Sequence, residues 1–125
     1  MLQIKKYTSC KSYLKEKPEL KKSINKALTR LTELITSYYE QKVPFEMIYS
    51  DKIVYDRHGI CAVFKCFTGN IQLRLLYAVH IDNNILHLCL VNYFVERNND
   101  KRYLKLFDNA NSLSMQAIFH NAISI

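Results

Sequence analysis

The sequence is poor in residues that interrupt regular structure. Its 125 residues include only two glycines and two prolines, which argues against long flexible linkers. It also lacks an apolar run near the roughly 20 residues that span a bilayer, and its first ten residues lack an apolar signal segment. We therefore expect one cytoplasmic domain over residues 1–125, long enough to bury a core unaided and with no membrane partner.

The four cysteines show no pattern typical of a metal site. Cys10, Cys61, Cys66 and Cys89 include no Cys-x-x-Cys pair and no Cys/His cluster with zinc-finger spacing. Cys61 and Cys66 would lie on opposite faces of one predicted strand, so they cannot bridge each other. The pattern predicts reduced, mostly buried thiols, with no metal and no cofactor.

Positive charge is what the sequence has in excess. Lysine and arginine number 18 against 11 aspartate and glutamate, which gives a formal charge of +7. A small domain with a pI near 9.3 favours an anionic partner, such as nucleic acid, an acidic protein or a membrane surface.

The first 40 residues predict a short strand followed by two helices. Leu2–Tyr7 alternates weakly, Ser9 suits a helix N-cap, and Pro18 suits the first turn of the second helix. The second helix has apolar residues at the spacing of one buried face: Leu20, Ile24, Leu28, Leu31 and Ile35. This stripe can cover a sheet or form a dimer seam. We interpret it as core, because the predicted sheet needs one face covered.

Residues 60–97 predict an antiparallel meander around which the rest of the chain is organised. Three runs rich in β-branched, aromatic and aliphatic residues follow one another: Ile60–Phe67, Ile71–Ile81 and Ile85–Val95. Gly69-Asn70 and Asn83-Asn84 separate them, and these residues tolerate the positive φ of tight hairpin turns.

The register of this meander decides which side chains share a face. With two-residue loops at both turns, Lys65 lies opposite Arg74, and Arg74 lies opposite Tyr93. One face is then apolar except for Asn92. The other face carries its polar residues in two groups about 20 Å apart: Lys65, Arg74, Tyr93 and Arg97, and then His80 and His87. A three-residue second loop would move the whole last strand to the opposite face. We prefer the two-residue loop because it separates polar from apolar residues better.

Lys65 and Arg74 form an unusual predicted pair. Like charges directly opposite each other on a sheet are unfavourable, so the pair suggests an anion between them, such as a phosphate or a partner's carboxylate. The alternative is that both side chains splay into water. We expect the helices to cover the apolar face and to leave the face with Lys65 and Arg74 open.

The order of elements predicts the α+β class. We expect an N-terminal helical hairpin packed on one face of an antiparallel, about four-stranded sheet, followed by a helical tail over about residues 109–125. The apolar residues of that tail suggest a closing helix: Leu113, Ile118, Phe119, Ala122 and Ile123.

At this point the chain resembles the RelE/ParE superfamily of bacterial toxins, in particular its RelE- and HigB-like members. The resemblance runs from about Leu2 to Arg102. Three segments carry it, in order: LQIKKYTSCKSYLKEKPELKKSINKALTRL, NIQLRLLYAV and ILHLCLVNYFVERNNDKR. Many relatives have a lysine pair where this chain has Arg97 alone, and the tail beyond Asp108 exceeds the usual family length.

The resemblance implies a type II toxin that cleaves ribosome-bound mRNA and is silenced by an acidic cognate antitoxin. In such enzymes the RNA 2′-hydroxyl attacks the adjacent phosphate. Carried over, Arg74 would bind the scissile phosphate, Tyr93 would stack on a base or assist proton transfer, and Arg97 would add a cation. Three further residues would bind the substrate: Lys65, Lys101 and Arg102.

Two other functions remain open on the same scaffold. One is inhibition of DNA gyrase, as in ParE-like toxins, and the other is nucleic-acid or protein binding without catalysis. The grouping of Lys65, Arg74 and Tyr93 favours RNA cleavage, because a gyrase inhibitor does not need cations that converge on an aromatic side chain.

Overall fold

The computed structural model describes residues 2–42, 57–97 and 100–125. The strands are β1 (Gln3–Thr8), β2 (Arg57–His58), β3 (Cys61–Thr68), β4 (Ile71–Asp82), β5 (Ile85–Glu96) and β6 (Ile123–Ser124). The helices are α1 (Lys11–Leu14), α2 (Pro18–Glu40), α4 (Arg102–Phe107), the 3-10 helix η1 (Asp108–Ser112) and α5 (Met115–His120). Within these residues, none of the helices is long and apolar enough to cross a membrane.

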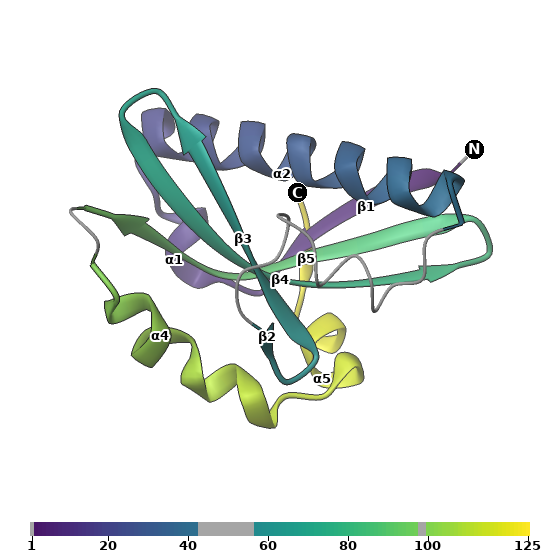
Figure 1. Cartoon of the computed structure of the whole chain (residues 1–125). Helices are drawn as coiled ribbons and strands as arrows, with labels where there is room; N and C mark the ends of the chain where they lie inside the picture. Colours follow the sequence, from purple (N-terminus) through teal and green to yellow (C-terminus); the bar gives the residue numbers. More distant parts are fainter. Residues whose placement is uncertain (1, 43–56, 98–99) are drawn as a thin grey trace.

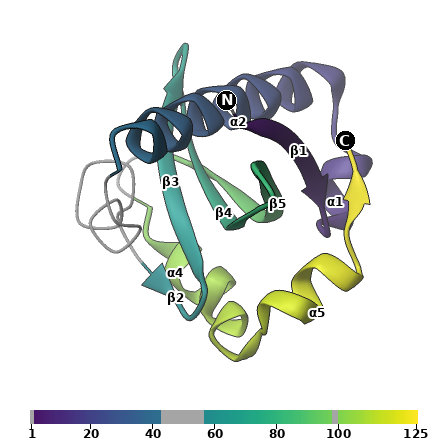
Figure 2. The same ribbon diagram turned by 90° about the vertical axis from the view of Figure 1, so that its right-hand side faces the viewer.

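The strands form one mixed sheet, so the predicted α+β class is confirmed and the predicted antiparallel sheet is wrong. The strand order is β2-β3-β4-β5-β1-β6. β1 runs parallel to β5, because the chain crosses over through α1 and α2 between β1 and the meander. Figure 1 shows α2 lying along the sheet, and Figure 2 shows the sheet between α2 and the C-terminal helices.

The face of the sheet under α2, here called the first face, carries the larger core. The predicted stripe of α2 supplies Ile24, Leu28, Leu31 and Ile35, each at most 1% exposed. They pack against alternate residues of β3, β4 and β5, which include Leu73, Leu75, Leu86, Leu88 and Leu90. The interpretation of the stripe as core is therefore confirmed.

Both predicted hairpin turns are present. Gly69, Asn83 and Asn84 have φ of 61°, 51° and 60°, in the left-handed region that glycine and asparagine tolerate best. Lys65 lies opposite Arg74, as predicted. Asp82 lies opposite Ile85, so the loop between β4 and β5 has two residues.

A β-bulge changes the register in the second half of β5. Tyr77 lies opposite Leu90, but Leu76 lies opposite Asn92, so Val91 is an extra residue on β5. Arg74 consequently lies opposite Phe94, and Tyr93 lies opposite Leu75. The predicted pairing of Arg74 with Tyr93 is wrong, because one inserted residue moves every later side chain to the other face.

The opposite, second face of the sheet is covered as well. The C-terminal segment crosses it and packs Tyr103, Phe107, Ala110 and Ile118 against the apolar residues of this face: Cys61, Val63, Leu76, Ala78 and Cys89. The chain then ends in β6, which pairs with β1 through Tyr7 and Thr8. The expectation that the face with Lys65 and Arg74 would be open is wrong, because five apolar side chains on it also need cover.

Candidate functional site

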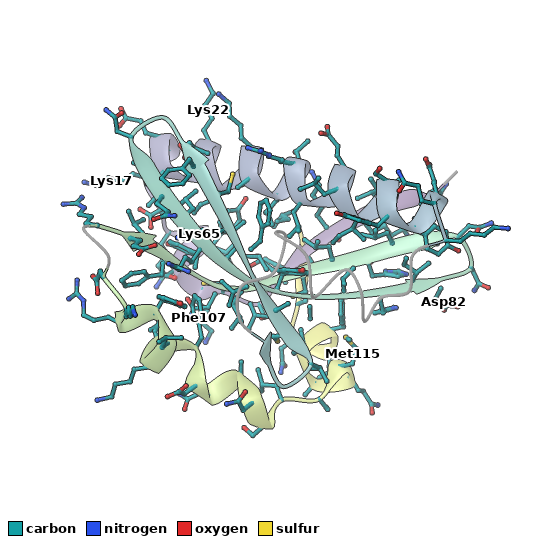
Figure 3. All side chains as sticks on the ribbon, viewed as in Figure 1. Lys17, Lys22, Lys65, Asp82, Phe107 and Met115 are labelled. Carbon is teal, nitrogen blue, oxygen red and sulfur yellow. The ribbon has the colours of Figure 1, made fainter. Side chains whose placement is uncertain are left out.

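The structure divides the predicted site residues between the two faces. Lys65 and Arg74 lie on the second face. Figure 3 shows Lys65 on the side of the sheet where α4 lies. Tyr93 packs against the core of the first face. Lys101 is exposed just before α4, and exposed Arg102 forms an ion pair with Asp100, with Nη2 2.7 Å from Oδ2. These predicted residues therefore do not form one cluster.

Arg74 is held by a carboxylate that the sequence patterns did not indicate. Its Nε and Nη2 each lie 2.8 Å from Oε2 of Glu96. The two side chains are only 7% and 4% exposed. The bulge in β5 explains the pair, because it brings Glu96 to the face and the end of the sheet where Arg74 lies. Arg74 has five N–H donors; its Nε–H donates to Glu96, and Nη2 completes the ion pair.

Gln72 extends this pair to Lys65. In the amide orientation that its neighbours require, Gln72 donates a hydrogen bond to Glu96 Oε2 over 2.8 Å. It accepts a hydrogen bond from Lys65 Nζ over 2.9 Å. The anion between the two predicted cations is therefore a carboxylate of the chain itself, reached by Lys65 through an amide. In the structure, the chain itself supplies an anion where the sequence predicted an external anion or side chains splayed into water.

The aromatic partner of Arg74 is Tyr103 rather than Tyr93. The Arg74 guanidinium carbon lies 4.0 Å from the centre of the Tyr103 ring, within the range of a cation–π contact. Tyr103 comes from the first turn of α4 and packs on Phe94 and Phe107 at centroid distances of 6.3 and 5.9 Å. α4 thus places an aromatic ring on a deeply buried cation of the sheet.

Tyr93 lies in a different polar environment on the first face. Its hydroxyl donates a hydrogen bond to Oε2 of Glu16, in the turn between α1 and α2. Burial, and then this bond, raise the pKa of Tyr93 to about 12. A shallow groove beside it is lined by Glu16, Lys17, Glu19 and Arg97, among others. Arg97 therefore lines a groove that contains two carboxylates, one of which accepts the Tyr93 hydrogen bond, and these carboxylates disfavour a phosphate.

His80 and His87 form a second group on the second face, as predicted. Their rings stack with centroids 4.5 Å apart, and the Phe119 ring of α5 meets both at a steep angle. The hydroxyl of Tyr7 hydrogen-bonds Nδ1 of His87 over 3.2 Å. Among the described residues, no three His, Cys, Asp or Glu side chains are placed to hold a metal ion.

We name the group formed by Lys65, Gln72, Arg74, Glu96 and Tyr103 the second-face cluster. Sequence reasoning missed Gln72, Glu96 and Tyr103. One signal of the bulge was present: Asn92 was the only polar residue assigned to the apolar face, and its side chain accepts a hydrogen bond from the Tyr93 backbone at the bulge. Comparison of the chain with family models, curated proteins and solved structures found no match.

Proposed function

We propose that this chain is an RNA-cleaving toxin of the RelE type and that it acts through the second-face cluster. An acidic antitoxin would silence it. The observation that carries the proposal is the convergence of Lys65, Arg74 and Tyr103 on one patch of the sheet, where Glu96 pairs with Arg74 and Gln72 connects Glu96 to Lys65. The five residues of the cluster comprise two cations and one carboxylate, a composition that suits a phosphodiester.

The chemistry of RNA cleavage gives each residue a role. When the 2′-hydroxyl attacks the phosphorus, its proton passes to solvent and the bond from phosphorus to the 5′-oxygen breaks. Negative charge builds on the phosphate oxygens, and prepositioned donors stabilise it. Arg74 has N–H donors beyond those that contact Glu96, and Lys65 adds a second cation. The Tyr103 hydroxyl would supply a proton to the leaving 5′-oxygen. Glu96 and Gln72 are positioning residues, since they orient the two cations.

The burial of the cluster sets a condition on this function. Arg74 and Tyr103 are each 6% exposed, so an RNA phosphate reaches Arg74 only when α4 moves aside. α4 has six residues, and three of its side chains are exposed in a row: Leu104, Lys105 and Leu106. A helix anchored mainly through Tyr103 and Phe107 can shift without disturbing the first core.

A second function is favoured by the same burial. An arginine neutralised by Glu96 and covered by Tyr103 also fits a purely structural ion pair in a protein that binds a partner without catalysis. The two functions differ in what they require of Tyr103. RNA cleavage requires its hydroxyl, whereas a structural contact with the Arg74 guanidinium requires only its ring.

The test compares three single variants of purified protein with ribosomes and message. We expect Tyr103→Phe to lose cleavage, scored by primer extension, because it removes the hydroxyl and keeps the ring. Tyr39→Phe, at an exposed tyrosine of α2, is the matched control and should cut like the wild type. Tyr93→Phe should also cut, since Tyr93 lies on the first face. Circular dichroism confirms that each variant is folded.

Three outcomes would contradict the proposal. If wild-type protein leaves message intact but DNA breaks accumulate at gyrase in cells that express it, the chain is a gyrase inhibitor. If it causes neither effect, the binding function stands. If Tyr103→Phe cuts at the wild-type rate while Tyr93→Phe does not, the chemistry takes place on the first face.

A further inference from the structure

The positive charge of the chain is concentrated in its N-terminal third. Residues 1–42 contain ten Lys or Arg and four Glu, so they carry six of the seven net charges. Most of these residues belong to β1, α1 and α2. The second-face cluster uses none of them, so this charge has no role in the function proposed above.

Part of this charge forms a continuous stripe on the outer side of α2. A shallow groove runs along it, lined by Pro18, Lys21, Lys22, Asn25, Lys26 and Thr29. These positions recur every three or four residues and so share one helix face. Lys6 of β1 reaches the same place, since its Nζ donates to Oγ1 of Thr29 over 3.1 Å. Figure 3 shows Lys22 extending from α2 away from the sheet.

The lining of this groove contains no carboxylate within the part of the chain that the structure describes. Two acids of the same helix lie next to this face: Glu19, three residues before Lys22, and Glu33, four residues beyond Thr29. Four lysines from two elements therefore present their ammonium groups together around this lining. Asn25 and Thr29 add uncharged hydrogen-bonding groups between them.

The composition of the stripe fits a phosphate backbone better than a protein partner. Protein interfaces are centred on apolar or aromatic anchors and are depleted in lysine. Among the described residues that line the groove, Pro18 is the only apolar one. Phosphate contacts are made by Lys, Arg, Asn and Thr side chains, the types found here.

The stripe also fits double-helical RNA better than a single strand. Proteins that bind single strands stack bases on exposed aromatic rings. The aromatic residue beside the stripe is Tyr13, which is 2% exposed and is capped by Lys21, with Nζ 5.1 Å from the ring centre. Duplex RNA is recognised through its shape, phosphates and 2′-hydroxyls, which the stripe can contact without aromatic rings.

We infer that the lysine stripe of α2 is a docking surface for the phosphate backbone of double-helical RNA. The inference builds on the proposed function and adds a partner to it. α2 covers the first face and the second-face cluster lies on the opposite side of the sheet, so the docked RNA and the cleaved RNA are different segments. A single-stranded message inside a particle rich in folded RNA, as a ribosome is, presents both.

The test measures binding to an RNA hairpin of about 16 base pairs, the length that a small duplex-binding domain covers, by fluorescence anisotropy over a series of salt concentrations. The variant is Lys22→Gln with Lys26→Gln, both at exposed positions. The control is Lys42→Gln with Lys105→Gln, also exposed, which removes the same charge away from the stripe. We expect the stripe variant to lower the slope of log K against log salt by about 2, because each lysine that no longer meets a phosphate lowers it by about 1. The control variant should bind like the wild type.

Two further arms decide the source of any weakened binding. Lys22→Arg with Lys26→Arg keeps the charge and should restore binding. Polyglutamate should compete poorly as a ligand, and tighter binding of polyglutamate than of the hairpin would make the stripe a site for an acidic protein. Equally weakened binding in the stripe variant and the control would overturn the inference, because net charge alone would then explain binding.

The readout keeps this inference separate from the proposed function. If Tyr103→Phe cuts at the wild-type rate, the proposed function fails and the hairpin measurement stands. If the stripe variant binds the hairpin like the wild type, the docking surface is wrong, and the cleavage result stands.

Discussion

The ion pair between Arg74 and Glu96 allows a sharp test of the structure. Its two side chains are 7% and 4% exposed, so truncating one partner leaves the other charge buried and uncompensated. Such a change costs about 3–5 kcal/mol of unfolding free energy. A domain of this size has about 5–15 kcal/mol in total. We therefore expect Arg74→Ala to remove a large part of the stability. If Arg74 lay in an open site, the same substitution would leave the fold nearly as stable as the wild type.

Three variants isolate the physical cause in urea denaturation at constant pH. Arg74→Ala and Glu96→Ala should each cost about 3–5 kcal/mol. The double variant Arg74→Met, Glu96→Leu removes both charges and refills the space, so it should lie close to the wild type or above it. The control is Arg102→Ala, which breaks the pair with Asp100. The Arg102 side chain is 83% exposed, so its removal should change the unfolding free energy far less than either single variant of the buried pair does.

Two results would refute this reasoning. A cost below about 1 kcal/mol for Arg74→Ala would mean that the pair is solvated and comparable to the surface pair. The double variant carries neither charge of the pair. If it were as unstable as the single variants, the loss of stability would come from the shape of the replaced side chains and not from an uncompensated charge. The double variant also serves the functional question, because it should be folded and, under the proposed function, should not cleave RNA.

Two further predictions concern stability. Gly59 has φ of 63°, and an added Cβ would lie 2.9 Å from the Asn111 backbone oxygen, whereas a Cβ on Gly69, with φ of 61°, meets nothing within 4 Å. Gly69→Ala should thus lower the unfolding free energy only by the strain of a left-handed alanine, about 1–2 kcal/mol. Gly59→Ala should lower it clearly more, as measured by thermal unfolding. Equal losses for the two variants would exclude the backbone contact at Gly59. Burial, and then the charges of His80 and Lys5, lower the pKa of His87, so the unfolded chain binds its proton first as the pH falls below about 6.5. Stability should therefore decline from neutral pH into the acid range, and His87→Gln should reduce that decline.

The parts of the fold that could be predicted depend on short-range patterns. The α2 stripe follows from a 3.6-residue period, and the two hairpins follow from alternating strands joined by Gly69-Asn70 and Asn83-Asn84. These signals fix the register of β3 on β4 and of β4 on the first half of β5. The parallel placement of β1 against β5 could not be predicted in this way, because it depends on where a crossover delivers a strand.

The candidate site was harder to predict because both faces of the sheet are apolar near it. The second face carries Cys61, Val63 and Leu76 between its polar residues, and these side chains were the available sign that something covers it. The three residues beyond the bulge are all apolar or aromatic and therefore fit either face of the sheet: Tyr93, Phe94 and Val95. Hydrophobicity therefore could not place the inserted residue, and the side chains after Val91 were assigned to the wrong faces.

One inserted residue thus changes the electrostatic nature of the site. In the register without a bulge, Arg74 faces Tyr93 and has only another cation beside it, which favours an external anion. With Val91 inserted, Glu96 comes to the same face as Arg74 and supplies the negative charge from within the chain. Tyr103, which belongs to α4 and comes ten residues after Tyr93 in the sequence, then supplies the aromatic ring beside Arg74. Because both replacements come from residues 96–107, the accessibility of Arg74 is determined by how firmly α4 is held, and any ligand of this face must compete with α4 and Glu96 for the same guanidinium.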